Sequence, residues 1–525
     1  MAEKIILNIS IILFGILFYK KIRHGLHMLQ LESYYNDRYF RWMKKNIKKV
    51  INPIEIIILL VPMRILAANQ IVPAYIVEIC LLILLILFTP KRKEKKAFVV
   101  TSRIKRTYGT FIILFLLIEL ILNLVNNMIL GIILLNILLI IAYLFVPLVN
   151  IINYPIENKI RKGFLKKAKK KLEEMKEIEV VGITGSYGKT TTKNIVNAIL
   201  SAKYNSVMTP ESFNTPMGVV RTINENIKAT DNIFVCEMGA KYVGDIKEIC
   251  DIVKPKYAII TAIGPQHLET FKTLENVRKT KLELVEAIPN DGIAFVNWED
   301  EEIRRSKINA KKIVRYGFNS KECDYYAKNI TSNESGSHFT VIMPNKKEIK
   351  IKTKLLGKLN ILNIVCGIAV ADKLGLSETQ MRMGVRFIKP VEHRLQIRKN
   401  ANGNIIIDDA YNSNVKGAQM ALDVLKSFKG KTRILVTPGI VELGDKQEEI
   451  NEDLGEKASK CADFIILVGE KQAQPILEGL KRKKYPEEQI FVAKNLQEGL
   501  TKLNEITVNK NSVILLENDL PDNYL

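Results

Sequence analysis

Long apolar runs dominate the pattern of the first 150 residues. They cover residues 5–19, 52–68, 71–89, 110–129 and 130–149. A helix that crosses a bilayer needs about 20 mostly apolar residues, with a range of about 17–25. The pattern therefore predicts a membrane domain over residues 1–155 with about five transmembrane helices, the last four forming two tight hairpins. The first run is short, but basic residues follow it, so we expect a retained anchor instead of a cleaved signal peptide.

Basic residues gather in three clusters around these runs, within residues 20–49, 91–106 and 159–171. With five spans all three clusters lie on the same side, and the positive-inside rule makes that side cytoplasmic. We therefore expect a multi-pass protein of the cell membrane whose later domains are cytoplasmic. The formal net charge of +23 fits attraction to an anionic membrane surface. The last two-thirds of the chain contain no basic strip studded with aromatic residues, so we expect no nucleic acid partner.

The pattern changes after residue 155. Residues 156–177 are rich in Lys and Glu, which predicts a basic connector helix. From residue 178 short apolar runs alternate with helical stretches, which predicts parallel sheets covered on both faces. We expect an α/β domain over 178–390 and a second, doubly wound and Rossmann-like domain over 391–525. The expected strands are Ile178–Ile183, Asn232–Glu237, Tyr257–Thr261 and Ile293–Val296, short β pieces near 313–355, and then Ile405–Asp408, Arg433–Thr437, Phe464–Val468, Ile490–Val492 and Val513–Glu517.

The turn after the first of these strands has the features of a phosphate-binding loop. It reads Gly185-x-x-Gly188-Lys189-Thr190, and a helix is predicted over Lys189–Leu200. Glycines let backbone N–H groups approach an anion, and the helix N-terminus adds its positive dipole end. Lys189 can reach outer phosphates, and the Thr190 hydroxyl can hold Mg²⁺. Ile183 stands where the strict eight-residue pattern has its first Gly, so an ordinary glycine turn with a surface lysine is the alternative.

Polar residues past the other strands are further candidates, because active sites of parallel sheets lie beyond the carboxyl ends of the strands. Glu237 and His267 could ligate Mg²⁺ beside a phosphate loop, although a histidine so placed is more often a loop residue. Lys281 lies on a predicted helix, where spacing alone favours a solvated charge. Asp408 and Asp409 end an apolar strand and would be buried there without a polar partner, so they indicate a site.

Taken together, these motifs resemble the Mur ligase family of ATP-dependent amide-bond-forming enzymes. Within that family the likeness is to the member that adds D-alanyl-D-alanine to UDP-N-acetylmuramoyl-tripeptide. The resemblance covers about 178–525 and does not extend to 1–177. The matching motifs, in family order, are Thr184-Gly185-Ser186-x-Gly188-Lys189-Thr190-Thr191, Glu237-Met238-Gly239, Ile263-Gly264-x-x-His267-Leu268-Glu269, Lys281-x-Glu283, Asn297, Gly357-x-x-Asn360, His393-Arg394-Leu395, Asp408-Asp409-Ala410-Tyr411-Asn412-x-Asn414 and Glu442-Leu443-Gly444.

The resemblance implies ATP and Mg²⁺ as cofactors and assigns a role to each matching residue. The ATP-binding set would be Gly185, Ser186, Tyr187, Gly188, Lys189, Thr190, Thr191, Asn297, Arg394 and Asp409. The Mg²⁺ ligands would be Thr190, Glu237, His267 and Lys281, the last matching the family's carbamylated lysine. Substrate binding would involve Asn214, Tyr411, Asn412 and Asn414. Catalysis would depend on Lys189, Lys281, His267 and Arg394.

The implied reaction joins an amino acid or small peptide to a cell-wall (peptidoglycan) precursor through an acyl phosphate. The membrane runs stand where the family has a domain for the uridine nucleotide, so our hypothesis is an acceptor presented at the membrane. Leu359, Val415 and the stretch 517–522 depart from the family pattern. Three alternatives stay open: the same chemistry on polyglutamate, teichoic acid or pseudomurein, an ATP-regulated membrane transport protein, and a catalytically inactive scaffold. The sequence gives no oligomeric state.

Overall fold

The protein is described by a computed structural model that falls into two compact units, Met1–Gly163 and Phe164–Leu525. The structure describes residues 2–51, 56, 60–62, 64–65, 70–88, 97–125, 128–211, 213–333, 336–400, 402–410, 414–441, 443–508 and 511–518. Each unit is described by itself below.

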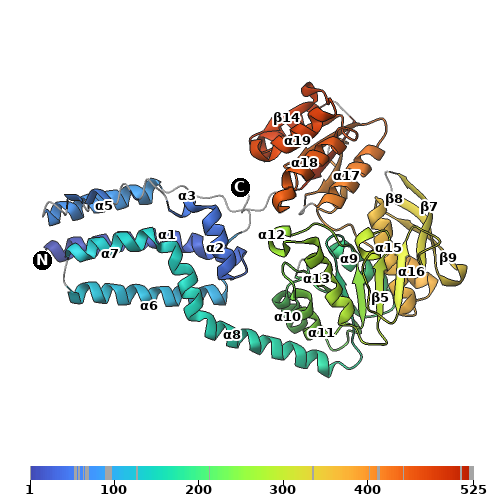
Figure 1. The fold of residues 1–525 in the computed structure, drawn as a ribbon, viewed down its shortest axis with the longest axis horizontal. Helices are drawn as coiled ribbons and strands as arrows, with labels where there is room; N and C mark the ends of the chain where they lie inside the picture. Colours follow the sequence, from blue (N-terminus) through green and yellow to red (C-terminus); the bar gives the residue numbers. More distant parts are fainter. Residues whose placement is uncertain are drawn as a thin grey trace. The chain divides into compact units, whose positions relative to one another are not determined.

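The first unit is helical (Figure 1). Its helices are α1 (Ala2–Leu31), α2 (Asn36–Lys45), α3 (Ile47–Val50), α5 (Ile71–Phe88), α6 (Ser102–Val125), α7 (Met128–Ile140) and the start of α8 (Ala142–Glu174). Helix α1 packs against α5 and α7, and the rings of Phe14 and Phe115 bring α6 to it with centroids 6.2 Å apart. Buried Tyr39 donates its hydroxyl to the Tyr143 carbonyl at 3.1 Å, so α2 is fixed against α8.

The predicted five spans are not supported by the residues that the structure describes. Among these, α5 is the one helix that is long and apolar enough to cross a membrane, and the pair Ile129–Ile140 and Ala142–Glu174, bent by 78°, is a second candidate if it is counted as one span. The predicted span 130–149 is divided by this bend. The predicted span 52–68 lies largely outside the described residues, and the five-span arrangement stays a prediction.

The expected connector over 156–177 is not a separate helix. Helix α8 runs without interruption from Ala142 to Glu174, with Pro147 and Pro155 inside it. Its last turns belong to the second unit, where Ala168 is fully buried and Lys171 Nζ donates to the Ile223 carbonyl at 2.8 Å. Apolar content alone did not predict this continuity, because a helix carries its backbone hydrogen bonds through polar and apolar stretches alike.

Within the described part of the second unit, nine strands form a sheet in the order β2-β3-β1-β4-β5-β6-β7-β8-β9. Pairing is parallel from β2 to β7 and antiparallel from β7 to β9. The strands are β1 (Glu179–Thr184), β2 (Ser206–Met208), β3 (Ile233–Glu237), β4 (Tyr257–Ile260), β5 (Ile293–Asn297), β6 (Ile313–Gly317), β7 (Tyr325–Asn333), β8 (Gly336–Ile342) and β9 (Glu348–Thr353).

Helices cover both faces of this sheet, as the apolar strands require. One face packs against α9 (Lys189–Leu200), α15 (Lys358–Lys373) and α16 (Glu378–Arg386). The other packs against α10 (Pro216–Glu225), α11 (Asp245–Val253), α13 (Leu274–Glu286) and α14 (Glu301–Arg304), and α12 (Leu268–Phe271) precedes α13. Strand β1 lies between β3 and β4, so the turn that follows it lies in the parallel part of the sheet, between two other strand ends.

A second sheet follows in the order β10-β11-β15-β12-β13-β14, counting only described residues. It is parallel except for β10. Its strands are β10 (Gln396–Lys399), β11 (Ile405–Asp409), β12 (Thr432–Thr437), β13 (Phe464–Val468), β14 (Ile490–Ala493) and β15 (Ser512–Glu517). Its helices are α17 (Val415–Ser427), α18 (Gln447–Ala458), α19 (Glu470–Arg482) and α20 (Leu496–Thr507).

The two predicted α/β domains are therefore confirmed, with mixed sheets. Strands β2 and β10 were not predicted, because each is a short edge strand without a fully buried residue. The domain boundaries stay predictions.

Two glycines let α18 and α19 approach at backbone distance. A Cβ on Gly455 would lie 2.2 Å from the Ile476 carbonyl oxygen, and one on Gly479 would lie 2.0 Å from the Glu452 carbonyl oxygen. Such distances cannot exist between real atoms, so a side chain at either position forces the helices apart.

We predict that Gly479→Ala lowers the free energy of unfolding by about 1–3 kcal/mol, the usual cost of overpacking. The measurement is the thermal midpoint of the purified full chain. Gly163→Ala is the control, because a Cβ there meets nothing within 4 Å and alanine is the better helix former. An unchanged midpoint for Gly479→Ala would contradict the backbone contact between α18 and α19.

Candidate active site

The turn from β1 to α9 forms a cradle that only glycine permits at two positions. Gly185 has φ 153°, and a Cβ there would lie 2.1 Å from Thr261 Oγ1. Gly188 has φ 79°, in the left-handed region that glycine favours. Ser186 donates its N–H to the Ala262 carbonyl at 2.7 Å. The turn is thus held against the loop that follows β4, and the N-terminus of α9 adds its positive dipole end, which favours an anion.

Lys189 begins α9 and folds back over this turn. Its Nζ donates to the Gly185 carbonyl at 2.7 Å and to the Ser186 carbonyl at 3.3 Å. Burial, opposed by the Glu237 charge and aided by the Arg394 charge, lowers the Lys189 pKa to about 8. A phosphate group beside Nζ would favour the charged ammonium. The geometry is therefore that of an anion site.

Glu237 ends β3 and is almost completely buried, with 1% of its surface exposed. Its Oε1 accepts hydrogen bonds from Thr190 Oγ1 at 3.1 Å and from Asn214 Nδ2 at 3.0 Å. Its Oε2 lies 3.1 Å from Lys193 Nζ, yet it accepts no hydrogen bond from any residue that the structure describes. A buried carboxylate with unused lone pairs on one oxygen and a threonine hydroxyl at the other suits a hard cation.

The residues present therefore fit Mg²⁺, which Thr190 and Glu237 would hold together with phosphate oxygens. The described residues contain no cluster of three or more His, Cys, Asp or Glu side chains arranged for a metal, but Mg²⁺ commonly takes only one or two carboxylates. His267 lies in the loop before α12 with φ 53°, and its carbonyl accepts the N–H groups of Thr270 and Phe271. Its assignment as a metal ligand stays a prediction.

Lys281 lies on α13 with only 2% of its surface exposed, so the alternative of a solvated charge is wrong. Burial lowers its pKa to about 7; the nearby Lys189 charge acts in the same direction, and Asp245 and Glu283 oppose it. An amine with this pKa is about half neutral at pH 7 and can act as a nucleophile.

Glu283, two residues after Lys281, accepts the Gly244 N–H at 2.7 Å and the Lys247 N–H at 2.9 Å, which fixes the start of α11.

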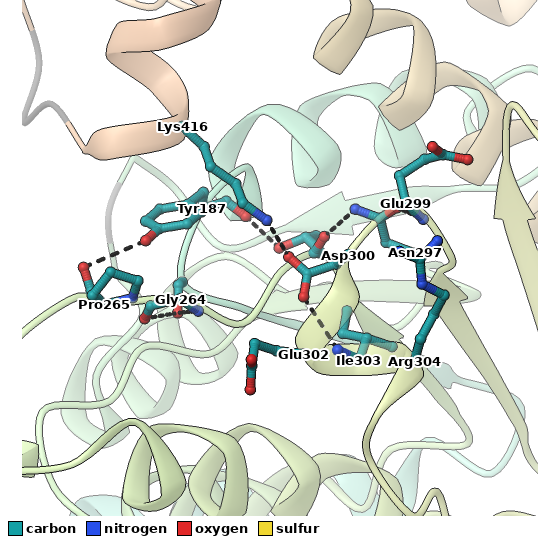
Figure 2. A network of polar contacts seen from close by, with 12 residues as sticks. Tyr187, Gly264, Pro265, Asn297, Glu299, Asp300, Glu302, Ile303, Arg304 and Lys416 are labelled. Atoms are coloured by element: carbon teal, nitrogen blue, oxygen red, sulfur yellow. Dashed lines mark hydrogen bonds and ion pairs between the residues drawn. The ribbon is translucent and has the colours of Figure 1, made fainter. Parts of the chain in front are cut away.

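A group of polar residues around Asp300, drawn with Tyr187 of the phosphate loop in Figure 2, connects the two α/β domains. Asn297 donates from Nδ2 to the Thr261 carbonyl at 2.7 Å. Asp300, 1% exposed, accepts the Ile303 N–H at 3.2 Å and pairs with Lys416 Nζ at 2.6 Å. Lys416 comes from α17 of the second sheet, so this ion pair connects the two domains. The predicted contact of Asn297 with adenine stays a prediction.

The turn between 391 and 395 brings charges of the second sheet to the site. Leu395 donates its N–H to Asp409 Oδ1 at 3.0 Å, and His393 Nδ1 lies 2.8 Å from Asp408 Oδ2. Burial raises the Asp409 pKa to about 6, which the Arg394 charge opposes. The Arg394 charge acts on the pKa values of both Lys189 and Asp409, so this guanidinium is within electrostatic range of both groups.

The predicted substrate residues are placed unequally. Asn214 lies in the loop between β2 and α10, where it contacts Glu237 and accepts the Gly239 N–H at 2.7 Å. Asn414 caps α17, with its Oδ1 accepting the Gly417 N–H at 2.8 Å. That cap is a structural role. Tyr411 and Asn412 lie outside the described residues.

Sequence reasoning missed three charged residues of this region. Lys193 lies one helical turn after Lys189, a spacing that places both on the same face of α9, so it could have been found. Asp300 follows β5 closely, which is the position that singled out the other strand-end residues. Lys416 gave no signal, because nothing in the sequence brings α17 to β5.

Comparisons with known proteins agree with this site. Residues 183–371 match the Mur ligase middle domain, and residues 393–517 match the Mur ligase glutamate ligase domain. The UDP-N-acetylmuramoyl-tripeptide–D-alanyl-D-alanine ligase of Escherichia coli K12 is 31% identical over 300 residues, covering 57% of this chain and 66% of the relative. Its counterpart in Bacillus subtilis is 30% identical over 289 residues, covering 55% and 62%. The chain thus spans less than two thirds of the length of these curated relatives.

Solved structures show the same likeness. MurF from Acinetobacter baumannii has a TM-score of 0.62 at 25% identity, covering 68% of this chain and 77% of that one. The MurF ligase from Thermotoga maritima in complex with ADP has a TM-score of 0.60 at 27% identity, covering 68% and 80%. The family matches assign residues 183–371, which contain the phosphate loop, Glu237 and Lys281, and residues 393–517 to the Mur ligase family, as its middle and C-terminal domains.

Proposed function

We propose that this chain is an ATP- and Mg²⁺-dependent peptide ligase of cell-wall precursor synthesis. By its likeness to the relatives, it joins D-alanyl-D-alanine to a muramoyl-tripeptide. The observation that carries this proposal is the group formed by Lys189, Thr190 and Glu237 at the carboxyl ends of β1 and β3. The anion site at Lys189 and the buried cation site at Thr190 and Glu237 adjoin at the first turn of α9. Phosphoryl transfer needs this arrangement.

The reaction has two steps that both place negative charge on oxygen. First, the carboxylate of the tripeptide attacks the γ-phosphorus of ATP, which forms an acyl phosphate and releases ADP. Then the amine of the dipeptide attacks the acyl carbon, and the tetrahedral adduct expels inorganic phosphate as the amine loses its proton. Lys189 and the N–H groups of the turn stabilise charge on the phosphoryl oxygens. Mg²⁺ would neutralise phosphate charge from its place at Thr190 and Glu237.

The first unit supports attachment to a membrane. Large apolar side chains on α1, α5 and α6 face outward, with exposures of 63% for Ile12, 70% for Leu87 and 74% for Leu124. Apolar patches of this kind mark interaction sites in water or a lipid-facing surface. We propose that this unit holds the ligase at the cell membrane with its catalytic domains in the cytoplasm, and that the acceptor is a lipid-linked precursor.

Replacing Lys189 by alanine tests the ligase. We expect phosphate release from ATP, in the presence of both substrates, to fall about 10²–10³-fold, because a preorganised donor to the developing charge is lost. Lys373→Ala, at an exposed position on α15, is the control and keeps wild-type activity. Equal rates for wild type and Lys189→Ala would refute phosphoryl transfer at this loop.

The acceptor is tested by offering D-alanyl-D-alanine with either a UDP-linked or a lipid-linked muramoyl-tripeptide. We expect phosphate release with the lipid-linked acceptor, because the first unit brings the ligase to the bilayer. Equal release with the UDP-linked acceptor would refute the membrane-presented acceptor and leave the ligase intact. If neither acceptor causes phosphate release in a chain that binds ATP, the same chemistry is assigned to another envelope polymer.

The pKa of Lys281 predicts how carbamylation depends on pH. Its lowered pKa of about 7 means that the neutral amine, the form that reacts with CO₂, increases as pH rises through 7. With ¹³C-bicarbonate we expect a carbamate resonance that grows between pH 6 and pH 8. The resonance is absent in Lys281→Met and retained in Lys241→Met. A signal independent of pH, or one that survives Lys281→Met, would contradict the assignment.

A further inference from the structure

Lys193 is a buried cation that the proposed reaction leaves without a role. It lies on α9, one turn after Lys189, and only 1% of its surface is exposed. Burying an ammonium is costly unless it is paired and hydrogen-bonded. Its Nζ meets both needs: it lies 3.1 Å from Glu237 Oε2 and donates to the backbone carbonyl of Glu211.

The second contact reaches the loop that precedes α10, here called the 209–215 loop. Asn214, in this loop, donates to Glu237 Oε1 at 3.0 Å. Thr209, at its start, accepts the Glu237 N–H at 3.1 Å. Lys193 therefore holds the same loop that Asn214 attaches to the carboxylate, from the opposite carboxylate oxygen.

The backbone after Glu237 also contacts the 209–215 loop. Gly239 donates its N–H to the Asn214 carbonyl at 2.7 Å, and a Cβ at Gly239 would lie 2.7 Å from the Asn214 side chain. The 209–215 loop thus packs directly on the backbone past β3. Any shift of this loop changes the position of the carboxylate, and the reverse also holds.

We infer that Lys193 is a positioning residue that ties the Mg²⁺ ligand Glu237 to the 209–215 loop and so couples cation binding to acceptor binding. This inference rests on the proposed function, in which Glu237 holds Mg²⁺, and on the predicted role of Asn214 in substrate binding. Lys193 acts in opposite directions on the two ligands. Its charge opposes a second cation at Glu237, whereas its hydrogen bond holds the loop in the arrangement that receives the acceptor.

Removing the charge separates the two effects. In Lys193→Met we expect the full chain to bind Mn²⁺ about tenfold more tightly in the presence of the non-hydrolysable ATP analogue AMP-PNP, because a repulsive charge is gone. We expect the acceptor KM to rise about tenfold in the same variant, because the loop has lost its tether. A residue that only supports folding would weaken both.

Electron paramagnetic resonance of free Mn²⁺ measures the first effect, and phosphate release measures the second. Lys193→Arg keeps the charge and the donor, so both values return toward wild type. Asn214→Ala also raises the acceptor KM, because it removes the other contact between the loop and the Glu237 carboxylate. Lys203→Met, at an exposed position just after α9, alters neither value.

Two outcomes overturn the inference: a Lys193→Met chain that binds Mn²⁺ no more tightly than wild type, or one whose acceptor KM is unchanged. If Lys193→Met loses its cooperative thermal transition, Lys193→Gln decides, because it removes the charge and keeps an amide donor; Mn²⁺ binding that is not tighter then refutes the inference. Wild type that fails to bind Mn²⁺ with AMP-PNP would instead refute the proposed function, so the two failures are distinguishable.

Discussion

The site depends on keeping opposite charges buried together at the end of β3. Glu237 and Lys193 each expose 1% of their surface and lie 3.1 Å apart. The cost of removing two charges from water often exceeds their mutual attraction, so such a pair is weak support for stability by itself. Removing either partner, however, leaves an uncompensated charge in the core. The pair therefore constrains every element that meets it: β3, α9 and the loop before α10.

Burial is also the main cause of the lowered pKa values of the other two lysines of the site. Lys189 and Lys281 lie close enough for the charge of Lys189 to lower the Lys281 pKa, and burial acts on both. Buried ammonium groups in excess attract anions to the carboxyl ends of the strands. A polyphosphate supplies such anions, so electrostatics and the backbone N–H groups of the turn select the same kind of ligand.

Much of the ligase half could be predicted from the sequence. Apolar strands buried on both faces read as continuous β-branched runs, and α9 has the predicted range Lys189–Leu200. Strand-end position found Glu237, because parallel strands place their carboxyl ends at one edge. Residues such as Asp300 and Lys416 could not be paired, since their contact depends on how two domains pack, which no local pattern encodes. The bend between α7 and α8 could not be predicted either, because hydropathy reports how apolar a stretch is and not that α7 ends at Ile140.

Asp300 serves two helix N-termini at once. It caps α14 by accepting the Ile303 N–H, and it pairs with Lys416 in the first turn of α17, where no acidic residue is present. A lysine at that end of a helix faces the positive end of the helix dipole, so the carboxylate of the neighbouring domain supplies the negative charge that α17 lacks. The side chains at positions 300 and 416 are therefore energetically coupled. Loss of the acid would leave a lysine disfavoured by its own helix, and related chains should exchange the two residues together.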